Sequence, residues 1–305
     1  MPDVLDPAGE GARRIADLTW FLFAAGAIVF IAVMVAFALA MRAGRNASGR
    51  TEEARGERLQ IVAGGVMPAL IVAVLFVVTL RALPVLTAAA DSSDTDVELI
   101  GRQWWWEVRY PRLGIVSANE INIPAGRPVR ITVRSADVIH SFWVPRLHGK
   151  IDLVPGRTNT LRLDATRAGT YRGQCAEYCG LQHTRMALRA VAHEPASYAA
   201  WADRERAAAT PPGDSLAASG MLVFDRVCAA CHAIRGTLAA GARGPDLTHV
   251  ASRATLAAGT VANTRANLTT WVAEAERIKP GNGMPSIRLA PGELAAVIAY
   301  LESLR

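Results

Sequence analysis

The sequence predicts a multidomain membrane protein with a two-helix transmembrane hairpin, an all-β domain and an all-α domain, in that order. Three observations support this fold class. Two long apolar runs occupy the first third of the chain, short alternating runs broken by proline and glycine occupy the middle, and helical periodicity fills the last third. A chain of 305 residues is long enough for all three parts.

The two apolar runs are predicted to cross a membrane as helices over residues 18–41 and 61–83. Each has roughly the 20 apolar residues that a bilayer span requires, and a buried helix of a soluble protein is rarely so long and so uniformly apolar. Gly64, Gly65 and Pro68 are expected to suit close helix packing within the membrane.

The connection between the spans, residues 42–60, is predicted to be a cytoplasmic loop, because arginine accumulates on that side of a membrane. The N-terminal tail of residues 1–17 and everything beyond the second span are then extracytoplasmic. In a Gram-negative bacterium, both termini and the soluble domains would lie in the periplasm, anchored to the inner (cytoplasmic) membrane and its lipid bilayer. The arginines of the connection are Arg42, Arg45, Arg50, Arg55 and Arg58.

The soluble part is predicted to contain two domains joined by a linker. Residues 95–194 show several short alternating runs with turn signals between them, which is typical of a β-sandwich or a Greek-key barrel. Residues 195–214 are predicted to form a helix and then a linker, which contains the TPPGD segment. The pattern turns helical over residues 215–305, so a separate all-α domain is expected there.

The four cysteines form two close pairs, Cys175 with Cys179 and Cys228 with Cys231. Close pairs with a histidine nearby are typical of metal or haem sites rather than of a disulfide framework. The formal charge of +6 comes almost entirely from arginine, since the chain has only two lysines. Because no basic run is interleaved with aromatic residues, we expect no binding to nucleic acid.

The CAACH segment, Cys228–His232, has the C-x-x-C-H pattern, in which two cysteines hold a haem covalently and the histidine is an axial ligand. Met284, in the NGMP segment before the last predicted helix, is the expected second axial ligand, since a thioether stabilises ferrous iron. The alternatives are Met221, which we expect in the core, and His249, which we expect at the surface.

This part of the chain resembles class I cytochrome c across residues 215–305. In that family, the proline of a segment such as GPDL offers its carbonyl oxygen to the axial histidine, and Pro245 occupies that position here. A hydrogen bond of this kind fixes the imidazole and tunes the iron. A proline also forms turns, and the two roles are compatible.

A second ligand-rich segment, YRGQCAEYCGLQHTRM, covers residues 171–186 and contains two cysteines, a histidine and a methionine. A zinc site and a mononuclear blue-copper site are both alternatives. A blue-copper site needs one thiolate, however, and two are present. His140 at the end of an upstream strand completes the layout of a cupredoxin metal site, in which a second thiolate makes room for two bridged copper ions.

Residues 1–200 resemble subunit II of the haem–copper cytochrome c oxidases, which carries the dinuclear copper A centre, and the pattern C-x-E-x-C-x-x-x-H-x-x-M is complete. The resemblance implies that Cys175 and Cys179 are bridging thiolates and that His140 and His183 each bind one copper. It also implies that Met186 is a weak ligand to one copper and the backbone carbonyl of Glu177 a weak ligand to the other. The resemblance also implies that the Glu177 side chain reaches a magnesium ion at the boundary with subunit I.

The GRQWWWEVRY segment is expected to form a strand with Trp104 and Trp106 on one face and Trp105 on the other. In the family, an aromatic run here lies beneath the copper loop, and its first tryptophan faces the incoming cytochrome c. Trp104 is therefore the candidate for the point where electrons enter, although the fused haem domain offers another path and at least one tryptophan should serve packing. The KIDLVPGR segment, residues 150–157, also resembles the family and is expected to face the catalytic subunit.

A subunit II fused to a cytochrome c domain is characteristic of the caa3-type oxidases. The resemblance implies that electrons pass from a cytochrome c or a bc1-type donor to the haem c, and then to copper A. They continue to the haem a and copper B of subunit I, where oxygen is reduced to water and protons are pumped; subunit III is a further expected partner. Three alternatives stay open: a copper A-containing nitric oxide reductase subunit, a free-standing membrane-anchored electron carrier and an oxidase assembly factor.

One departure from the family concerns proton uptake. Many members carry a glutamate about seven residues before a proline near the start of the second span, at the mouth of a proton channel. Counting back from Pro68 gives Ile61, and the nearest carboxylate is Glu57, about one helical turn earlier. We expect Glu57 to be a solvated loop charge, and its role as a replacement stays open.

Replacing Met186 with leucine tests the weak-ligand role. We expect copper to stay bound, because the thiolates and imidazoles retain it, while the potential of the centre shifts and electron transfer slows. Copper content, midpoint potential and transfer rate of the purified variant are the measurements. Complete loss of copper would contradict this role.

Overall fold

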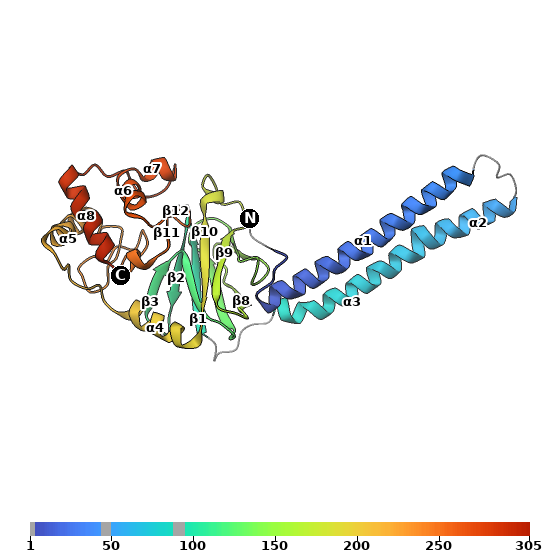
Figure 1. Ribbon diagram of the computed structural model, residues 1–305, viewed down its shortest axis with the longest axis horizontal. Coiled ribbons are helices and arrows are strands. Elements are labelled where there is room, and N and C mark those ends of the chain that lie inside the picture. Colours follow the sequence, from blue (N-terminus) through green and yellow to red (C-terminus); the bar gives the residue numbers. More distant parts are fainter. Residues whose placement is uncertain (1–3, 44–49, 88–94) are drawn as a thin grey trace. The chain divides into compact units, whose positions relative to one another are not determined.

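The chain divides into two compact units, one formed by residues 13–87 and the other by residues 1–12 together with 88–305. The first unit holds a helical hairpin, and the second holds a β domain followed by a helical domain (Figure 1). The predicted fold class is therefore confirmed. The computed structural model describes residues 4–43, 50–87 and 95–305.

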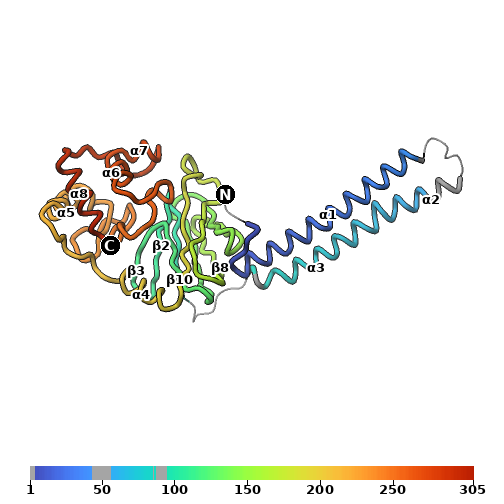
Figure 2. Tube along the Cα trace, viewed as in Figure 1, coloured from blue at the N-terminus to red at the C-terminus, as the bar shows by residue number. Residues whose placement is uncertain are grey.

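The hairpin unit consists of long helices with apolar surfaces. The chain runs out along α1 and returns along α2, a π-helical turn and α3 (Figure 2). Two stretches with a mean hydropathy of 2.8 are long enough to cross a membrane, and their side chains are not buried within the chain. Such uniform apolar exposure suits contact with lipid. The elements are α1 (Glu10–Ala43), α2 (Arg50–Ile61), the π turn (Val62–Val66) and α3 (Met67–Thr87).

Both helices extend beyond the apolar runs seen in the sequence. α1 begins at Glu10, before the predicted start at Leu18. The second helical stretch begins at Arg50, inside the segment expected to be a loop, because the polar sequence there is rich in arginine and glutamate, which are good helix formers. Arg45 and the side chains of Arg50 and Arg55 lie outside the described residues.

The π turn contains the glycine pair that the sequence associated with close helix packing. No described atom lies within 4 Å of the position that a Cβ would take on Gly64 or Gly65. The pair therefore makes no close helix contact within the described chain, and the expected packing is absent there. Glu57 is exposed on α2, ahead of Ile61, which is exposed as well.

The β domain is a sandwich of two five-stranded sheets, with strand orders β3-β2-β1-β5-β8 and β4-β10-β9-β6-β7. Alternate side chains point inward, as in β5, where Val129, Ile131 and Val133 are fully buried. The strands are β1 (Thr95–Arg102), β2 (Trp105–Tyr110), β3 (Ile115–Ala118), β4 (Glu120–Pro124), β5 (Val129–Ser135), β6 (His140–Trp143), β7 (Ile151–Leu153), β8 (Asn159–Leu163), β9 (Gly169–Cys175) and β10 (Ala187–His193).

The register of three strands gathers the ligand-rich segment at one end of a sheet. β9 pairs with β10 so that Gln174 lies opposite Ala187, and β9 pairs with β6 so that Phe142 lies opposite Cys175. The segment between β9 and β10 therefore leaves and re-enters the sheet beside the start of β6, where His140 lies. We call residues 175–186 the ligand loop.

The three consecutive tryptophans do not share one strand. β1 ends at Arg102 and β2 begins at Trp105, so Trp104 lies in the turn between them. Trp106 is fully buried in the core, whereas Trp104 and Trp105 are partly buried. The expectation that Trp104 and Trp106 share a strand face is wrong, because the turn reverses the chain before the pleat reaches Trp104.

The residues ahead of the first apolar run pack on the β domain. Ala8 is fully buried, its N–H donates to the carbonyl of Arg146 at 2.7 Å, and its carbonyl accepts from the N–H of Thr166 at 2.7 Å. A Cβ on Gly9 would stand 2.3 Å from the carbonyl oxygen of Leu147, so this close approach requires glycine. The predicted N-terminal tail is thus partly integrated into the core of the β domain.

The helical domain is built around α5 (Ser215–Val227) and α8 (Pro291–Ser303). The two helices share a core in which the rings of Phe224 and Tyr300 meet edge to face, with centroids 5.7 Å apart. The other elements after the β domain are α4 (Pro195–Arg206), a 3₁₀ turn (Val250–Ser252), β11 (Thr255–Leu256), β12 (Val261–Ala262), α6 (Arg265–Ala273) and α7 (Ala275–Ile278).

Gly220 lets α5 and α8 approach closely, since a Cβ there would stand 1.9 Å from the carbonyl oxygen of Ala296. We expect Gly220→Ala to lower the free energy of unfolding of the helical domain by about 1–3 kcal/mol, because the helices must separate to admit a methyl group. Denaturant unfolding of the purified chain measures the loss. Gly213→Ala is the control, since no atom lies within 4 Å of its Cβ position. Equal stability of the two variants would contradict the expected clash.

Candidate functional site

The ligand loop brings two buried thiols close together. The Sγ atoms of Cys175 and Cys179 are 3.7 Å apart, and both residues are free cysteines. This distance is far too long for a disulfide bond, which is about 2 Å. The two sulfurs are therefore arranged as neighbouring ligands rather than as a covalent bridge.

Each of the two thiols has a histidine beside it. The Nδ1 of His140, from the start of β6, is 3.9 Å from the Sγ of Cys175. The Nδ1 of His183, from a 3₁₀ turn in the ligand loop, is 3.6 Å from the Sγ of Cys179. The ligand atoms of His140, Cys175 and Cys179 all lie within 4.8 Å of one another, and His183 lies outside this trio. The two imidazoles therefore lie beside different thiols, and the ligand nitrogen of His140 is within 4.8 Å of both sulfurs.

Two further donor atoms complete the set. The Sδ of Met186 is 3.9 Å from the Sγ of Cys179, and the carbonyl oxygen of Glu177 is 3.2 Å from the Sγ of Cys175. An ion bound to sulfur at ~2.3 Å and to nitrogen at ~2.0 Å separates its ligand atoms by about 3.5–4 Å. The separations fit such bonds, and six donor atoms exceed the four that one tetrahedral ion takes, which fits two ions that share the thiols.

The protonation of the two thiols favours binding of a cation even before a metal ion is present. The hydrogen bond with Cys179 lowers the pKa of the Cys175 thiol to about 3, although burial opposes this. The Cys175 thiolate in turn raises the pKa of Cys179 above its usual range. One thiolate is therefore present at neutral pH, and a metal ion would have to displace only the second proton.

Sequence reasoning missed Asp137, whose Oδ1 lies 2.7 Å from the Nε2 of His140. Burial alone would lower the pKa of His140, but this hydrogen bond raises it above its usual range. The carboxylate orients the imidazole so that Nδ1 faces the thiols, an arrangement typical of metal-binding histidines. The only sequence signal was an aspartate three residues before a candidate ligand, in the segment ADVIH.

The turn before β2 supports the ligand loop from outside. The Nε1 of Trp104 and the Nε2 of Gln103 both donate to the carbonyl of Cys179, at 2.9 and 2.8 Å. Trp104, predicted to lie beneath the copper loop, is thus in direct contact with it. Gln103 was not predicted, and a glutamine in a turn carries no distinctive signal.

The carboxylate of Glu177, which was predicted to reach a magnesium ion, lies near the side chain of Lys150. Its Oε2 lies 3.4 Å from the Nζ of Lys150, which also lies 3.6 Å from Asp152. Its Oε1 accepts from the N–H of Tyr178 at 3.2 Å. The side chain is partly exposed and offers carboxylate oxygens to a hard cation.

The C-x-x-C-H segment follows α5, as a haem attachment site requires. Cys228 and Cys231 are free and half-buried. The Nδ1 of His232 lies 2.8 Å from the carbonyl oxygen of Pro245, which leaves Nε2 available to iron. Burial lowers the pKa of His232, so the ring is neutral and suited to bind a metal. A Cβ on Gly244 would stand 2.5 Å from this ring, so glycine lets the loop reach the imidazole. These residues fit a haem.

The predicted second axial ligand and its alternatives lie in different environments. Met284 is half-buried on the loop between α7 and α8, where its N–H donates to the side chain of Asn282 at 2.7 Å. Met221 packs against the core of the helical domain, as expected. The expectation that His249 is a surface residue is wrong: it is buried, with Nε2 3.2 Å from the carbonyl oxygen of Ala207, because the connection after α4 covers it.

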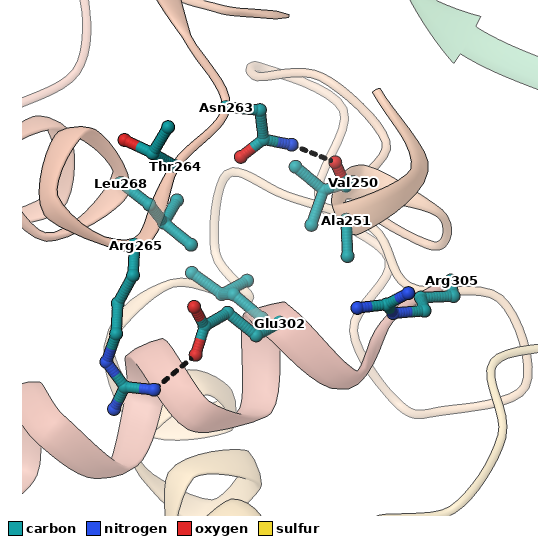
Figure 3. A pocket seen from close by; sticks show the side chains of 9 residues that line it. Val250, Ala251, Asn263, Thr264, Arg265, Leu268, Glu302 and Arg305 are labelled. Carbon is teal, nitrogen blue, oxygen red and sulfur yellow. Dashed lines mark hydrogen bonds and ion pairs between the residues drawn. The ribbon is translucent and has the colours of Figure 1, made fainter. Parts of the chain in front are cut away.

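A cavity of about 330 Å³ lies elsewhere on the helical domain (Figure 3). Its polar lining includes the Arg265–Glu302 ion pair and the side chain of Asn263, which donates to the carbonyl of Val250. The cysteines and the histidine of the C-x-x-C-H segment do not line it. It is therefore separate from the haem ligands and gives no sign of a role in the chemistry.

Comparison with known proteins gives the same two-part division of the soluble region. Residues 112–192 match the family model for the periplasmic domain of cytochrome c oxidase subunit II, and residues 217–305 match the model for cytochrome c. Cytochrome c oxidase subunit 2 of Alkalihalophilus pseudofirmus is 33% identical over 99% of this chain and 90% of that protein. The subunit 2 of Bacillus subtilis is 28% identical over 99% of this chain and 91% of its own length.

One solved structure among the similar ones is the periplasmic domain of subunit II of cytochrome oxidase from Bradyrhizobium japonicum. It is 30% identical to this chain, and the match covers 38% of this chain and 96% of that one, with a TM-score of 0.37.

A membrane-anchored chain with a two-thiol cupredoxin-type site and a cytochrome c domain is a subunit of a haem–copper oxidase. The chain belongs to the cytochrome c oxidase subunit 2 family. It follows that the chain has periplasmic domains, that its two cofactors are copper A and haem, and that it associates with other subunits of an oxidase.

Replacing Asp137 with asparagine tests the support of His140. We expect copper to bind about 10- to 100-fold more weakly, because an amide holds the imidazole less firmly than a carboxylate does. Copper titration of the purified chain, followed by the absorption of the thiolate–copper bands, measures the change. Asp203→Asn, at an exposed aspartate of α4, is the matched control. An affinity of D137N equal to that of the control would show that the hydrogen bond has no part in metal binding.

Proposed function

We propose that this chain is the electron-input subunit of a terminal cytochrome c oxidase of the caa3 type. Electrons from a cytochrome c or a bc1-type donor reach the haem c of this chain, then its dinuclear copper centre, and then the haem of subunit I, where oxygen is reduced to water and protons are pumped. The single observation that carries the proposal is the set of donor atoms around Cys175 and Cys179, with a different imidazole beside each thiol.

The proposed copper ligands divide into strong and weak ones. Cys175 and Cys179 bridge the two ions, and His140 and His183 bind one ion each. The Met186 thioether and the Glu177 carbonyl are weak ligands, one to each ion, and each lies within 4 Å of a bridging thiol. When bound, such a pair takes up and releases one electron.

The protein's own contribution is to hold these ligands still. Cys175, Cys179, His140 and Met186 are all at least 96% buried, so water has little access to the donor atoms. The ligands come from adjacent strands and one short loop, whose backbone pairs continue into the sheet. A site built on rigid elements changes little between redox states, which favours fast electron transfer.

For the haem, we assign Cys228 and Cys231 as the covalent attachment points and His232 and Met284 as the axial ligands. Pro245 supports the assignment of His232, since its carbonyl oxygen accepts the Nδ1 hydrogen and holds the ring in one tautomer. A thioether on the other side of the iron would raise its potential, which suits an electron acceptor.

The proposed partners follow from the surfaces around the copper site. A magnesium ion at the boundary with subunit I would take one carboxylate from Glu177 and the rest of its ligands from that subunit or water, and it would compete there with Lys150. Residues 150–157 face the same partner, and subunit III completes the assembly. Trp104 is proposed as the residue through which electrons reach the copper site, supported by its hydrogen bond to Cys179.

The proposed topology has two spans in the bacterial inner membrane, with residues 42–60 in the cytoplasm. Both termini and the soluble domains lie in the periplasm. The contacts of Ala8 with Arg146 and Thr166 support this topology, because residues that are hydrogen-bonded to each other lie on the same side of a membrane. The arginines of the connection support the cytoplasmic side.

The optical spectrum of the native complex, purified through a tag on this chain, tests the proposed function. We expect a reduced-minus-oxidised spectrum with an a-type and a c-type haem band together, since subunit I and this chain contribute one type each. A b-type band without the a-type would refute the a-type oxidase and favour nitric oxide reduction or another oxidase. A c-type band alone, with no large subunit in the preparation, would instead favour a free-standing carrier.

A further inference from the structure

A short segment of the helical domain, residues 278–281, lies against the ligand loop, and we call it the docking segment. The Nε2 of Gln182 donates to the carbonyl of Pro280 at 2.7 Å, and the Nη1 of Arg185 donates to the carbonyl of Ile278 at 2.6 Å. Both donors belong to the ligand loop, whereas the docking segment leads from α7 towards the proposed axial methionine. The segments that contain the copper and haem ligands are therefore in direct contact.

Lys279 is the buried cation of the docking segment, with 3% of its surface exposed. Its Nζ donates to the carbonyls of Trp104 at 2.6 Å, Arg185 at 2.8 Å and Ala257 at 3.1 Å. An ammonium group has three N–H donors, so these three acceptors use all of them. Two acceptors belong to the β domain and one to the helical domain, so a single charged group joins the two.

The chemistry of this contact makes it intolerant of movement. Burial lowers the pKa of Lys279 to about 7, because removing the charged ammonium from water is unfavourable. A neutral amine has only two N–H donors and would leave one carbonyl unmatched, so the three carbonyls together favour the charged form. A displacement that breaks these hydrogen bonds while water stays excluded would leave the ammonium and its acceptors unpaired, and an unpaired buried charge is strongly unfavourable.

Strained backbone occurs at the same contact. Ala257 and Ala258 adopt left-handed conformations, with φ of 52° and 57°. Such conformations are unfavourable for residues with a Cβ and persist where the surroundings fix them. The carbonyl of Ala257 accepts from Lys279, and the carbonyl of Ala258 accepts from the N–H of Ala187 at 2.9 Å, directly after the ligand loop. The strained turn is thus held by the interface between the domains.

Two further hydrogen bonds join the helical domain to the preceding part of the chain outside the docking segment. The carboxylate of Glu120, on β4, accepts from the N–H of Ala254 in the helical domain at 2.9 Å. The Nη1 of Arg235, after the C-x-x-C-H segment, donates to the carbonyl of Glu205 on α4 at 2.6 Å. Contacts at more than one place oppose rotation of the helical domain as well as its separation from the β domain. They therefore favour one position of the docking segment on the ligand loop.

We propose that Lys279 is a positioning residue for electron transfer within this chain, because it fixes the docking segment against the ligand loop. The proposal rests on the proposed function, in which the haem domain supplies electrons to the copper site. Each β-domain acceptor of Lys279 is next to the copper ligands: Trp104 donates its indole N–H to the carbonyl of Cys179, and Arg185 precedes Met186. Electrons then cross from the chain's own cytochrome domain at the docking segment.

The test is intramolecular electron transfer in the purified oxidase complex that contains the Lys279→Met variant. Methionine has a similar length but lacks the charge and all three donors. A flash-activated ruthenium complex reduces the haem. The absorbance changes of the haem and copper bands then report the rate at which the electron moves from haem to copper. We expect the haem-to-copper rate to fall by at least about tenfold, because a displacement on the ångström scale between reacting groups has an effect of that order or larger.

A control variant and further measurements distinguish an effect on positioning from a general loss of folding or of cofactors. Arg277→Gln removes a cation of α7, two residues from Lys279, that is 67% exposed and pairs with Glu274 just before that helix. Copper content and haem content should match those of the unaltered complex in K279M and R277Q, and both midpoint potentials are measured so that rates are compared at equal driving force. Pulsed electron paramagnetic resonance between the oxidised copper pair and the oxidised haem gives their distance distribution. It should be narrow in the unaltered complex and in R277Q, and broader in K279M.

The outcomes distinguish this proposal from the proposed function. A K279M complex with the unaltered rate and distance distribution would overturn the role of Lys279. If K279M does not assemble, Lys279→Gln, which keeps a two-donor amide, is measured in the same way, and an unaltered rate and distance there would overturn it too. A narrow distance distribution in the unaltered complex without any haem-to-copper transfer would refute the proposed function and leave the structural role of Lys279 intact.

Discussion

One backbone hydrogen bond closes the ligand loop, from the N–H of Cys175 to the carbonyl of Met186 at 2.9 Å. It extends the antiparallel ladder of β9 and β10 to the two ends of the loop, so the residues between them must turn back within a few ångströms. The thiols and the second imidazole converge for that reason, and β6 adds His140 from the next strand. The sandwich, the tryptophan turn and the docked helical domain all surround this closed loop.

Much of the site could be predicted because its ligands are local in sequence. The spacing of Cys175, Cys179 and His183 within one loop indicates a metal site, and that of Cys228–His232 after a helix indicates a haem site, while the resemblance to a known family supplied the choice of copper A. His140 was found because it lies next to a recognisable strand, although it begins β6 and does not end a strand as predicted. The predictions that failed depended on distant parts of the chain: the turn at Trp104 breaks an apparently continuous strand, and the connection after α4 covers His249.

The residues that sequence reasoning missed act through the backbone or through one long-range contact. Asp137 is three residues from His140, but only the folded turn brings its carboxylate to the ring. Lys279 finds its acceptors 175, 94 and 22 residues away, and all three are carbonyl groups. Because any residue type offers a carbonyl, such acceptors leave no compositional trace. The interface therefore depends on the paths of the loops, which periodicity and spacing do not define.

The buried position of Ala8 also constrains the order in which the chain is made. This residue precedes the first apolar helix, yet it fills the core of a domain that begins after the second one and hydrogen-bonds to Arg146 and Thr166. Translocation of the N-terminus across the membrane is therefore a condition for completing the β domain. Synthesis order and assembly order differ here, since one of the first residues made reaches its final site only after Arg146 and Thr166 have been made.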